Sequence, residues 1–349
     1  MGNLCNPVRL HSKSQPTAPF TGTMKHRIIR LACTLALALS GALGLLAGCA
    51  PEPTRTIHVG TNIWPGYEPG YLAAAEGLYG DAPVRMRQFT SATEVLRAFR
   101  IDAIQVAALT LDEVLQLQQY GLDVVVILVA DISDGADVIL ARPEVGSVAA
   151  LAGRRVAVEN TALGAYMLAR ALQLHGVDPA SVEVLPITVD ESVDAYVKRR
   201  ADAVVTFEPF RSKLLEAGAQ QIFSSTEMPA EIVDVLVTRR ATLEAHESTL
   251  KAFVQGWLGG IELIRTEPDR MSQLMAQRLD LSPAEALASF DGLTLPDAAR
   301  NRTLLGSADG GLRSSAQRLG AVLAASGLLK AEVATDKLFD DRLIPPGNP

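Results

Sequence analysis

A strand that leads directly into an aromatic turn and a helix begins the folded part of this chain. Residues 57–63 alternate apolar side chains with smaller or polar ones, which is typical of a β-strand. Pro65 and Gly66 then favour a turn, and Pro69 suits the first turn of a helix, where its missing N–H is not needed. The stretch therefore predicts a strand–turn–helix unit, the building block of α/β folds.

Three side chains of this turn are candidates for ligand binding. In an open α/β sheet, ligands bind beyond the carboxyl ends of the strands, which is where Trp64, Tyr67 and Glu68 are expected. Two aromatic rings and an acid share one turn rather than one face of a helix, which favours a binding role. The alternative is that Trp64 only packs against the edge of a domain.

The order of strand followed by helix recurs along the chain, and its length leaves room for two domains. Apolar runs predict further strands at 84–89, 101–107, 124–129, 154–159, 182–187, 202–206 and 232–237. Helices are predicted at 94–99, 111–119, 162–175 and 190–199. Beyond residue 250 the spacing is mainly helical, and it places Trp257 in the core. The pattern indicates an α/β protein with a helical C-terminal part.

Hydroxyl side chains precede two of the predicted helices. Ser91 and Thr93 stand before the helix at 94–99, and Thr110 stands before the helix at 111–119. Hydroxyl groups and free backbone N–H groups at a helix start can hold an anion or a carboxylate. The same residues are equally well explained as N-caps, so both interpretations stay open.

The N-terminal segment predicts export. Residues 1–23 show no periodicity, Met24 is a candidate start, and a basic stretch at 25–30 precedes an apolar run at 31–46 that ends in small residues before Cys49. This junction resembles the bacterial lipobox, which implies cleavage and lipid attachment at Cys49. Residues 1–48 are then leader and signal peptide, and 49–54 are a linker. The alternative is an uncleaved membrane anchor, because the run approaches spanning length.

Charge and composition exclude several functions. Five basic and no acidic residues precede Cys49, so removal of this segment takes the net charge from −7 to −12. Such a body repels nucleic acid, and no nucleic-acid partner is expected. No cysteine follows Cys49, which excludes a disulfide, a thiolate metal site and a cysteine nucleophile there. Phosphate-binding, dinucleotide-binding and hydrolase motifs are also absent, so no cofactor, metal or catalytic residue is predicted.

These features together resemble one family of transport proteins. The lipobox, the unit at 57–79, the stretch at 151–158 and the stretch at 203–209 look like the substrate-binding proteins of ABC importers. The similar branch is the nitrate, sulfonate and taurine group, which also contains binders of thiamine-pyrimidine precursors. The likeness extends over about 57–265, and it rests on the order and spacing of the motifs.

The resemblance implies a two-lobed, periplasmic-binding-protein type II fold with two hinge crossovers. Lobe 1 is expected to comprise residues 55–140 plus 235–349, and lobe 2 residues 141–234. The crossovers are expected near 131–138 and 228–235. A ligand would bind between the lobes, and closure would present a new surface to a membrane permease.

The resemblance also implies a pocket formed by the turns at helix starts. Carried over to this sequence, its residues are Trp64, Tyr67, Ser91, Thr93, Thr110, Ser133, Asp134, Asn160, Thr161 and Glu208. The expected partners are a small-molecule ligand, ABC permease subunits and the membrane that holds the lipid on Cys49. The protein is expected to be a monomer that faces the periplasm or the cell exterior.

The expected ligand is a small organic molecule that contains nitrogen or sulfur, either sulfonate-like or taurine-like or pyrimidine-like. Helix starts and hydroxyl groups favour an anion, whereas Glu68, Asp134, Glu159 and Glu208 at the same rim would repel one. These acids shift the expectation toward a nitrogen-containing ligand.

Two other functions remain open on the sequence. The first is a receptor module that feeds a membrane sensor, which needs the same closing cleft. The second is an enzyme of the pyrimidine-forming branch. That branch carries a cysteine-rich motif, which this body lacks, so the chain is not expected to be an enzyme.

Overall fold

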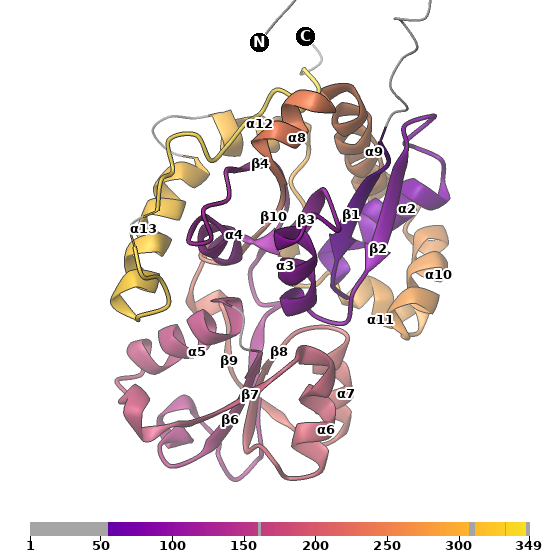
Figure 1. Cartoon of the computed structure of the whole chain (residues 1–349). Helices are drawn as coiled ribbons and strands as arrows, with labels where there is room; N and C mark the ends of the chain where they lie inside the picture. Colours follow the sequence, from indigo (N-terminus) through magenta and orange to yellow (C-terminus); the bar gives the residue numbers. More distant parts are fainter. Residues whose placement is uncertain (1–54, 160–161, 307–310, 332, 347–349) are drawn as a thin grey trace, which may run out of the picture. The chain divides into compact units, whose positions relative to one another are not determined.

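The computed structural model describes residues 55–159, 162–306, 311–331 and 333–346. Their strands form two separate sheets, with helices around them (Figure 1). This is the α/β, two-sheet arrangement that the sequence predicts. Cys49, with the leader and the linker, lies outside the described residues.

The first sheet has six strands in the order β11-β4-β10-β3-β1-β2. Their bounds are β1 Ile57–Thr61, β2 Val84–Gln88, β3 Val106–Thr110, β4 Val124–Ser133, β10 Val233–Arg239 and β11 Leu293–Thr294. Strand β1 pairs in parallel with β2 and β3, whereas β10 is antiparallel to both β3 and β4. The carboxyl ends of β1 and β3 therefore point to the same edge of the sheet as the start of β10.

The second sheet has five strands in the order β7-β6-β8-β5-β9. Their bounds are β5 Val138–Ala141, β6 Arg155–Glu159, β7 Glu183–Ile187, β8 Ala203–Thr206 and β9 Gln220–Ser224. Strand β6 is parallel to β7 and β8, and β5 is antiparallel to β8 and β9. The edge strand β9 was not predicted, because it has too few buried residues to form an apolar run in the sequence.

Helices cover the sheets and bury their strands. They are α2 Glu68–Ala75, α3 Ala92–Arg100, α4 Leu111–Gln118, α5 Ala162–Leu174, α6 Ser192–Val197, α7 Phe210–Glu216, α8 Arg240–Ala245, α9 Glu247–Thr266, α10 Pro268–Leu279, α11 Pro283–Ala288, α12 Ala298–Gly306 and α13 Leu312–Ala325. Strand β4 is buried on both faces from Val124 to Asp131, as its continuous apolar run predicts. Among the described residues, no helix is both long and apolar enough to cross a membrane.

The C-terminal helices pack closely against the first sheet unit. Trp257 on α9 is fully buried, which confirms its predicted place in the core. Gly260 on the same helix lets α9 approach α2, since a Cβ there would lie 2.1 Å from the carbonyl oxygen of Pro69. This contact holds α2, and with it the turn that precedes α2, against the rest of the chain.

The chain crosses between the two sheets twice, once from β4 to β5 and once from β9 to β10. The two crossings are joined by hydrogen bonds. The hydroxyls of Ser133 and Ser225 lie 2.8 Å apart, and the backbone N–H of Ser225 donates to the carbonyl oxygen of Asp137 at 2.9 Å. The first crossing ends before Val138, because β5 pairs within the second sheet.

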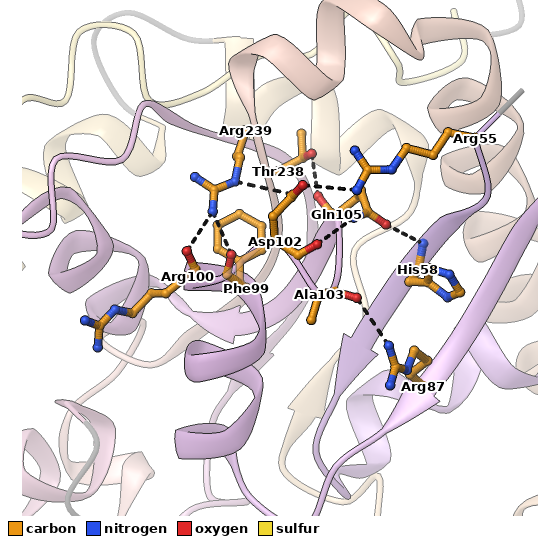
Figure 2. Close-up of polar contacts among 10 residues, drawn as sticks. All are labelled: Arg55, His58, Arg87, Phe99, Arg100, Asp102, Ala103, Gln105, Thr238 and Arg239. Carbon is orange, nitrogen blue, oxygen red and sulfur yellow. Dashed lines mark hydrogen bonds and ion pairs between the residues drawn. The ribbon is translucent and has the colours of Figure 1, made fainter. Parts of the chain in front are cut away.

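Residues 101–105 do not form the strand that their sequence predicts; β3 begins only at Val106. Figure 2 shows polar contacts that hold this segment as a turn. Asp102 has a left-handed backbone (φ 60°), and its carboxylate pairs with Arg55 at 3.0 Å. The side-chain oxygen of Gln105 accepts from the backbone N–H of His58 at 3.1 Å. These contacts are long-range, so local periodicity could not report them.

Candidate ligand-binding site

A small cavity lies where strand ends of the two sheets meet. From the first sheet it is lined by Asn62 after β1 and Thr110 at the end of β3. From the second sheet it is lined by Glu159 at the end of β6 and Thr206 at the end of β8. Its volume of about 40 Å³ leaves room for a few water molecules. The position is the one where open α/β sheets bind ligands.

Aromatic rings from both sides form the apolar part of the cavity. The rings of Trp64 and Phe207 pack edge to face, with their centroids 5.1 Å apart and their planes at 86°. Such edge-to-face pairs are favourable beyond the area they bury. Tyr67 lines the cavity beside them, and all three side chains come from turns that follow a strand.

The aromatic turn is anchored to buried acids of the first sheet. The indole Nε1–H of Trp64 donates to Asp131 on β4 at 3.0 Å, and the hydroxyl of Tyr67 donates to Asp234 on β10. Gly66 makes this approach possible, because a Cβ there would lie 1.9 Å from Asp131 Oδ2. The turn between β1 and α2 is thus held in place by two carboxylates.

Carboxylates of the protein already occupy the helix starts that face the cavity. The backbone N–H and the hydroxyl of Thr93, in the first turn of α3, donate to Glu159 at 3.1 and 3.0 Å. The backbone N–H of Thr110, which precedes α4, donates to Glu113 at 3.0 Å. These are the groups that an anionic ligand would need. The Thr93–Glu159 contact also links the two sheet units across the cavity.

Burial raises the pKa of every acid in this region. It raises the pKa of Glu113 and Asp131 to about 8 and that of Asp137 to about 7. The pKa of Asp234 and of Glu159 is raised as well, again mainly by burial. Among the described residues that line the cavity there is no Lys, Arg or His. No positive charge therefore offsets the cost of ionising these groups.

Several buried polar atoms at the cavity have no hydrogen-bond partner among the described residues. They are Thr206 Oγ1 and Asp137 Oδ2 on cavity-lining residues, and Asp131 Oδ1 behind Trp64. An unpaired buried polar atom is costly, on the order of 1–3 kcal/mol. Their grouping around one cavity makes it the candidate ligand-binding site.

The structure brings some of the predicted site residues together and separates others. Trp64, Tyr67 and Thr110 line the cavity, and Thr93 reaches it through Glu159. Ser91 caps α3 by accepting from the N–H of Glu94 at 3.4 Å. Asn160 and Thr161 lie outside the described residues.

Four other predicted acids and hydroxyls have partners elsewhere or face solvent. Ser133 bonds to Ser225 in the crossings, and Asp134 is exposed. Glu208 accepts from the N–H and hydroxyl of Ser212 at the start of α7. Glu68 is fully buried and pairs with Arg278 at 2.8 Å, away from the cavity.

Sequence reasoning missed Glu113, Asp131, Asp137, Asp234 and Phe207 as members of the site. One signal could have found three of the acids. Asp131 and Asp234 each interrupt an apolar run within a strand, and Asp137 directly precedes the apolar strand β5. An acid that interrupts a buried strand is costly, so it marks a candidate functional position.

Solved structures share this fold at low sequence identity. The alkanesulfonate-binding protein SsuA from Xanthomonas axonopodis pv. citri, bound to MOPS, matches with a TM-score of 0.69 and 17% identity, over 81% of this chain and 97% of its own. The nitrate-binding protein NrtA from Synechocystis PCC 6803 matches with 0.65 and 13%, over 84% and 88%. The desulfurization enzyme DszB matches with 0.62 and 15%, over 82% and 97%.

Sequence comparison places the chain in a family. No curated protein matches it. The NMT1-like family model matches residues 50–279, which include both sheets except the short strand β11. The fold shared with SsuA and the two crossings between sheets agree with this match. The chain belongs to the NMT1-like family and has the periplasmic-binding-protein fold.

Proposed function

We propose that this protein is the solute-binding component of an ABC importer, which captures a small organic molecule between two lobes. The observation that carries the proposal is the cavity between the strand ends, to which both sheet units contribute acids and rings. Neighbours with the same fold bind small solutes, among them an alkanesulfonate-binding and a nitrate-binding protein. Lobe 1 would carry the first sheet and lobe 2 the second, with hinges at the two crossings.

The proposed role is binding rather than catalysis. DszB shows that an enzyme can have this fold, and a cysteine-to-serine mutant of it was solved in complex with biphenyl-2-sulfinic acid. In this chain all three cysteines, Cys5, Cys33 and Cys49, precede residue 55, where the described residues begin. The acids at the cavity have raised pKa values, and the cavity-lining residues that the structure describes include neither a cysteine nor a serine.

Ligand-induced closure is the test of this function. The exposed side chains of Lys213 on α7 and Asp280 after α10 lie 2.9 Å apart and belong to different proposed lobes. Spin labels on Lys213→Cys and Asp280→Cys, with the three native cysteines replaced by serine, would report their separation. We expect the ligand to narrow the distribution of label distances around the short separation seen in this structure, because closure holds the two proposed lobes together.

The probes for this experiment are methanesulfonate, taurine, nitrate, 4-aminopyrimidine, acetamidine and guanidinium. A control label pair within one lobe, Asp81→Cys with Arg85→Cys, should not respond. An unchanged distance distribution with a probe that binds by calorimetry would contradict a closing binding protein. Closure accompanied by stimulated ATP hydrolysis of the partner permease complex supports import, whereas stimulation of a sensor kinase would assign the receptor role instead.

We also propose that the mature protein is an exported lipoprotein anchored through Cys49. The expected result for Cys49→Ser is release from the membrane fraction, because the lipid chains provide the anchoring. Cell fractionation and immunoblotting measure it, with Cys5→Ser as a control that stays bound. Retention of the Cys49→Ser protein would instead favour an uncleaved apolar anchor at residues 31–46.

A further inference from the structure

The cavity combines buried acids with hydrogen-bond acceptors that nothing satisfies among the described residues. Asp137 and Asp234 are almost fully buried at its wall, with 2% and 3% of their surface exposed. Asp137 Oδ2 and Thr206 Oγ1 have no partner in the part of the chain that the structure describes. These atoms come from two separate segments and converge on one cavity, which a ligand rich in donors would satisfy.

The same geometry disfavours an anion. An anionic ligand needs free N–H groups at helix starts, but Glu159 and Glu113 already accept from Thr93 and Thr110. The side-chain donors of Trp64 and Tyr67 are likewise directed at acids. The protein's own carboxylates therefore stand where a sulfonate or nitrate group would be held.

A metal ion is also a poor fit. Among the described residues, no group of three or more His, Cys, Asp or Glu side chains has an arrangement that could hold one. The ring pair of Trp64 and Phe207 at the wall instead suits a flat or organic cation, which aromatic faces attract.

We propose that the cavity binds a small, flat organic cation with several N–H donors, such as an amidinium or a guanidinium. This inference rests on the proposed function and names its substrate class. The N–H groups would donate to Asp137 and Asp234 and to the hydroxyl of Thr206. Bonds between ionised partners are about twice as strong as neutral ones.

Binding of such a cation would release protons. The groups that face the cavity or interact across it are all acidic: Tyr67, Asp112, Glu113, Asp131, Asp137, Glu159, Asp190 and Asp234. In the empty site burial raises the pKa values of Glu113, Asp131 and Asp137, so that these carboxyls are largely protonated at neutral pH. The cation takes the place of the proton: a carboxylic acid becomes a carboxylate beside the ligand, and the proton leaves to solvent.

The test is calorimetry on the purified protein with acetamidine, whose four heavy atoms suit the small cavity, and with acetamide, its neutral counterpart of the same shape. Acetamidine is expected to bind at least tenfold more tightly. Its affinity should rise from pH 6 to pH 8 by about tenfold per pH unit for each proton released. Titrations in two buffers of different ionisation enthalpy count these protons.

Two variants test whether the cation binds at Asp137 in the cavity. Asp137→Asn keeps the size of the side chain and removes its charge, so acetamidine affinity is expected to fall about tenfold or more. The exposed Asp81→Asn carries the same charge change far from the cavity and should leave affinity unchanged. An equal effect of both variants would overturn the assignment of the cation to this cavity.

The outcomes separate this inference from the proposed function. Binding and closure with methanesulfonate or nitrate, but not with acetamidine or guanidinium, would overturn the cation proposal and leave the solute-binding role standing. If no probe binds and none causes closure, both the cation and the solute-binding role lose their support. If acetamide binds as tightly as acetamidine, the cavity is assigned to neutral ligands instead.

Discussion

Replacing Trp64 with alanine is expected to lower the free energy of unfolding by about 3–5 kcal/mol, as for other large buried aromatics. The indole is 4% exposed, meets Phe207 edge to face, and donates to Asp131 at 3.0 Å. Its removal leaves a cavity and takes away the hydrogen bond to Asp131, whose Oδ1 already has no partner among the described residues. Chemical unfolding in guanidinium chloride measures the loss.

The variant Trp64→Phe separates the two contributions. It keeps an aromatic ring against Phe207 but removes the N–H that Asp131 accepts. We expect it to cost about 1–3 kcal/mol, as for a buried acceptor left unpaired, and so less than the alanine variant. A loss below about 1 kcal/mol for Trp64→Ala would show that the turn is not an integral part of the core.

The empty protein is expected to be most stable near pH 5 and to lose stability as the pH rises to 8. The acids at the cavity have a higher pKa in the folded protein than in the unfolded chain, where carboxyls titrate near pH 4. Below that pH both states are protonated. Above it, the unfolded chain releases protons that the folded protein retains until its own pKa, about 7 for Asp137 and 8 for Glu113 and Asp131. The unfolded state then binds fewer protons, so stability falls with pH.

Other acids set the lower pH limit of this stability optimum. Arg270 lowers the pKa of Glu76, and Lys213 lowers that of Asp280. Such groups contribute stability above their unfolded pKa and lose it as the pH falls below about 4. Both are solvent-exposed, so their contribution is small beside that of the buried cluster.

Thermal unfolding of the empty protein measures the pH effect. With several buried acids involved, the loss between pH 5 and pH 8 is expected to be several kcal/mol, roughly 10 °C in melting temperature. Asp137→Asn should be more stable than the wild type at pH 8 and little changed at pH 4, because its amide cannot ionise. A melting temperature that rises steadily from pH 5 to pH 8 would contradict the raised pKa values.

If Asp137→Asn stabilises the empty protein, the acid must be present for a reason other than stability. The same substitution is expected to weaken cation binding, so the site trades stability for function. An acid that is costly in the empty protein can be useful only when a ligand pairs with it. The two measurements on this one variant should therefore move in opposite directions.

The amino-acid sequence by itself determined the fold class and most of its elements. The alternation at 57–63, the apolar run of β4 and the helical spacing around Trp257 are local patterns of burial, and periodicity reports burial directly. The sequence also indicated the turn at Trp64 and Tyr67 as a candidate binding site, since α/β sheets bind ligands at the ends of their strands. The segment at 101–105 was wrongly predicted as strand because contacts with Arg55, His58 and Arg239 hold it as a turn.

The site was decided by tertiary structure. Asp137 and Asp234 are nearly a hundred residues apart in the chain, and only the pairing of antiparallel β10 beside β3 and β4 brings them to one cavity. Whether the N–H groups at a helix start are free to bind an anion also depends on distant residues. The N–H of Thr93, at the start of α3, already donates to Glu159, which belongs to the other sheet. Hydroxyls and N–H groups can be located from sequence, but whether they are free or already bonded depends on which distant side chains the fold brings within hydrogen-bond reach.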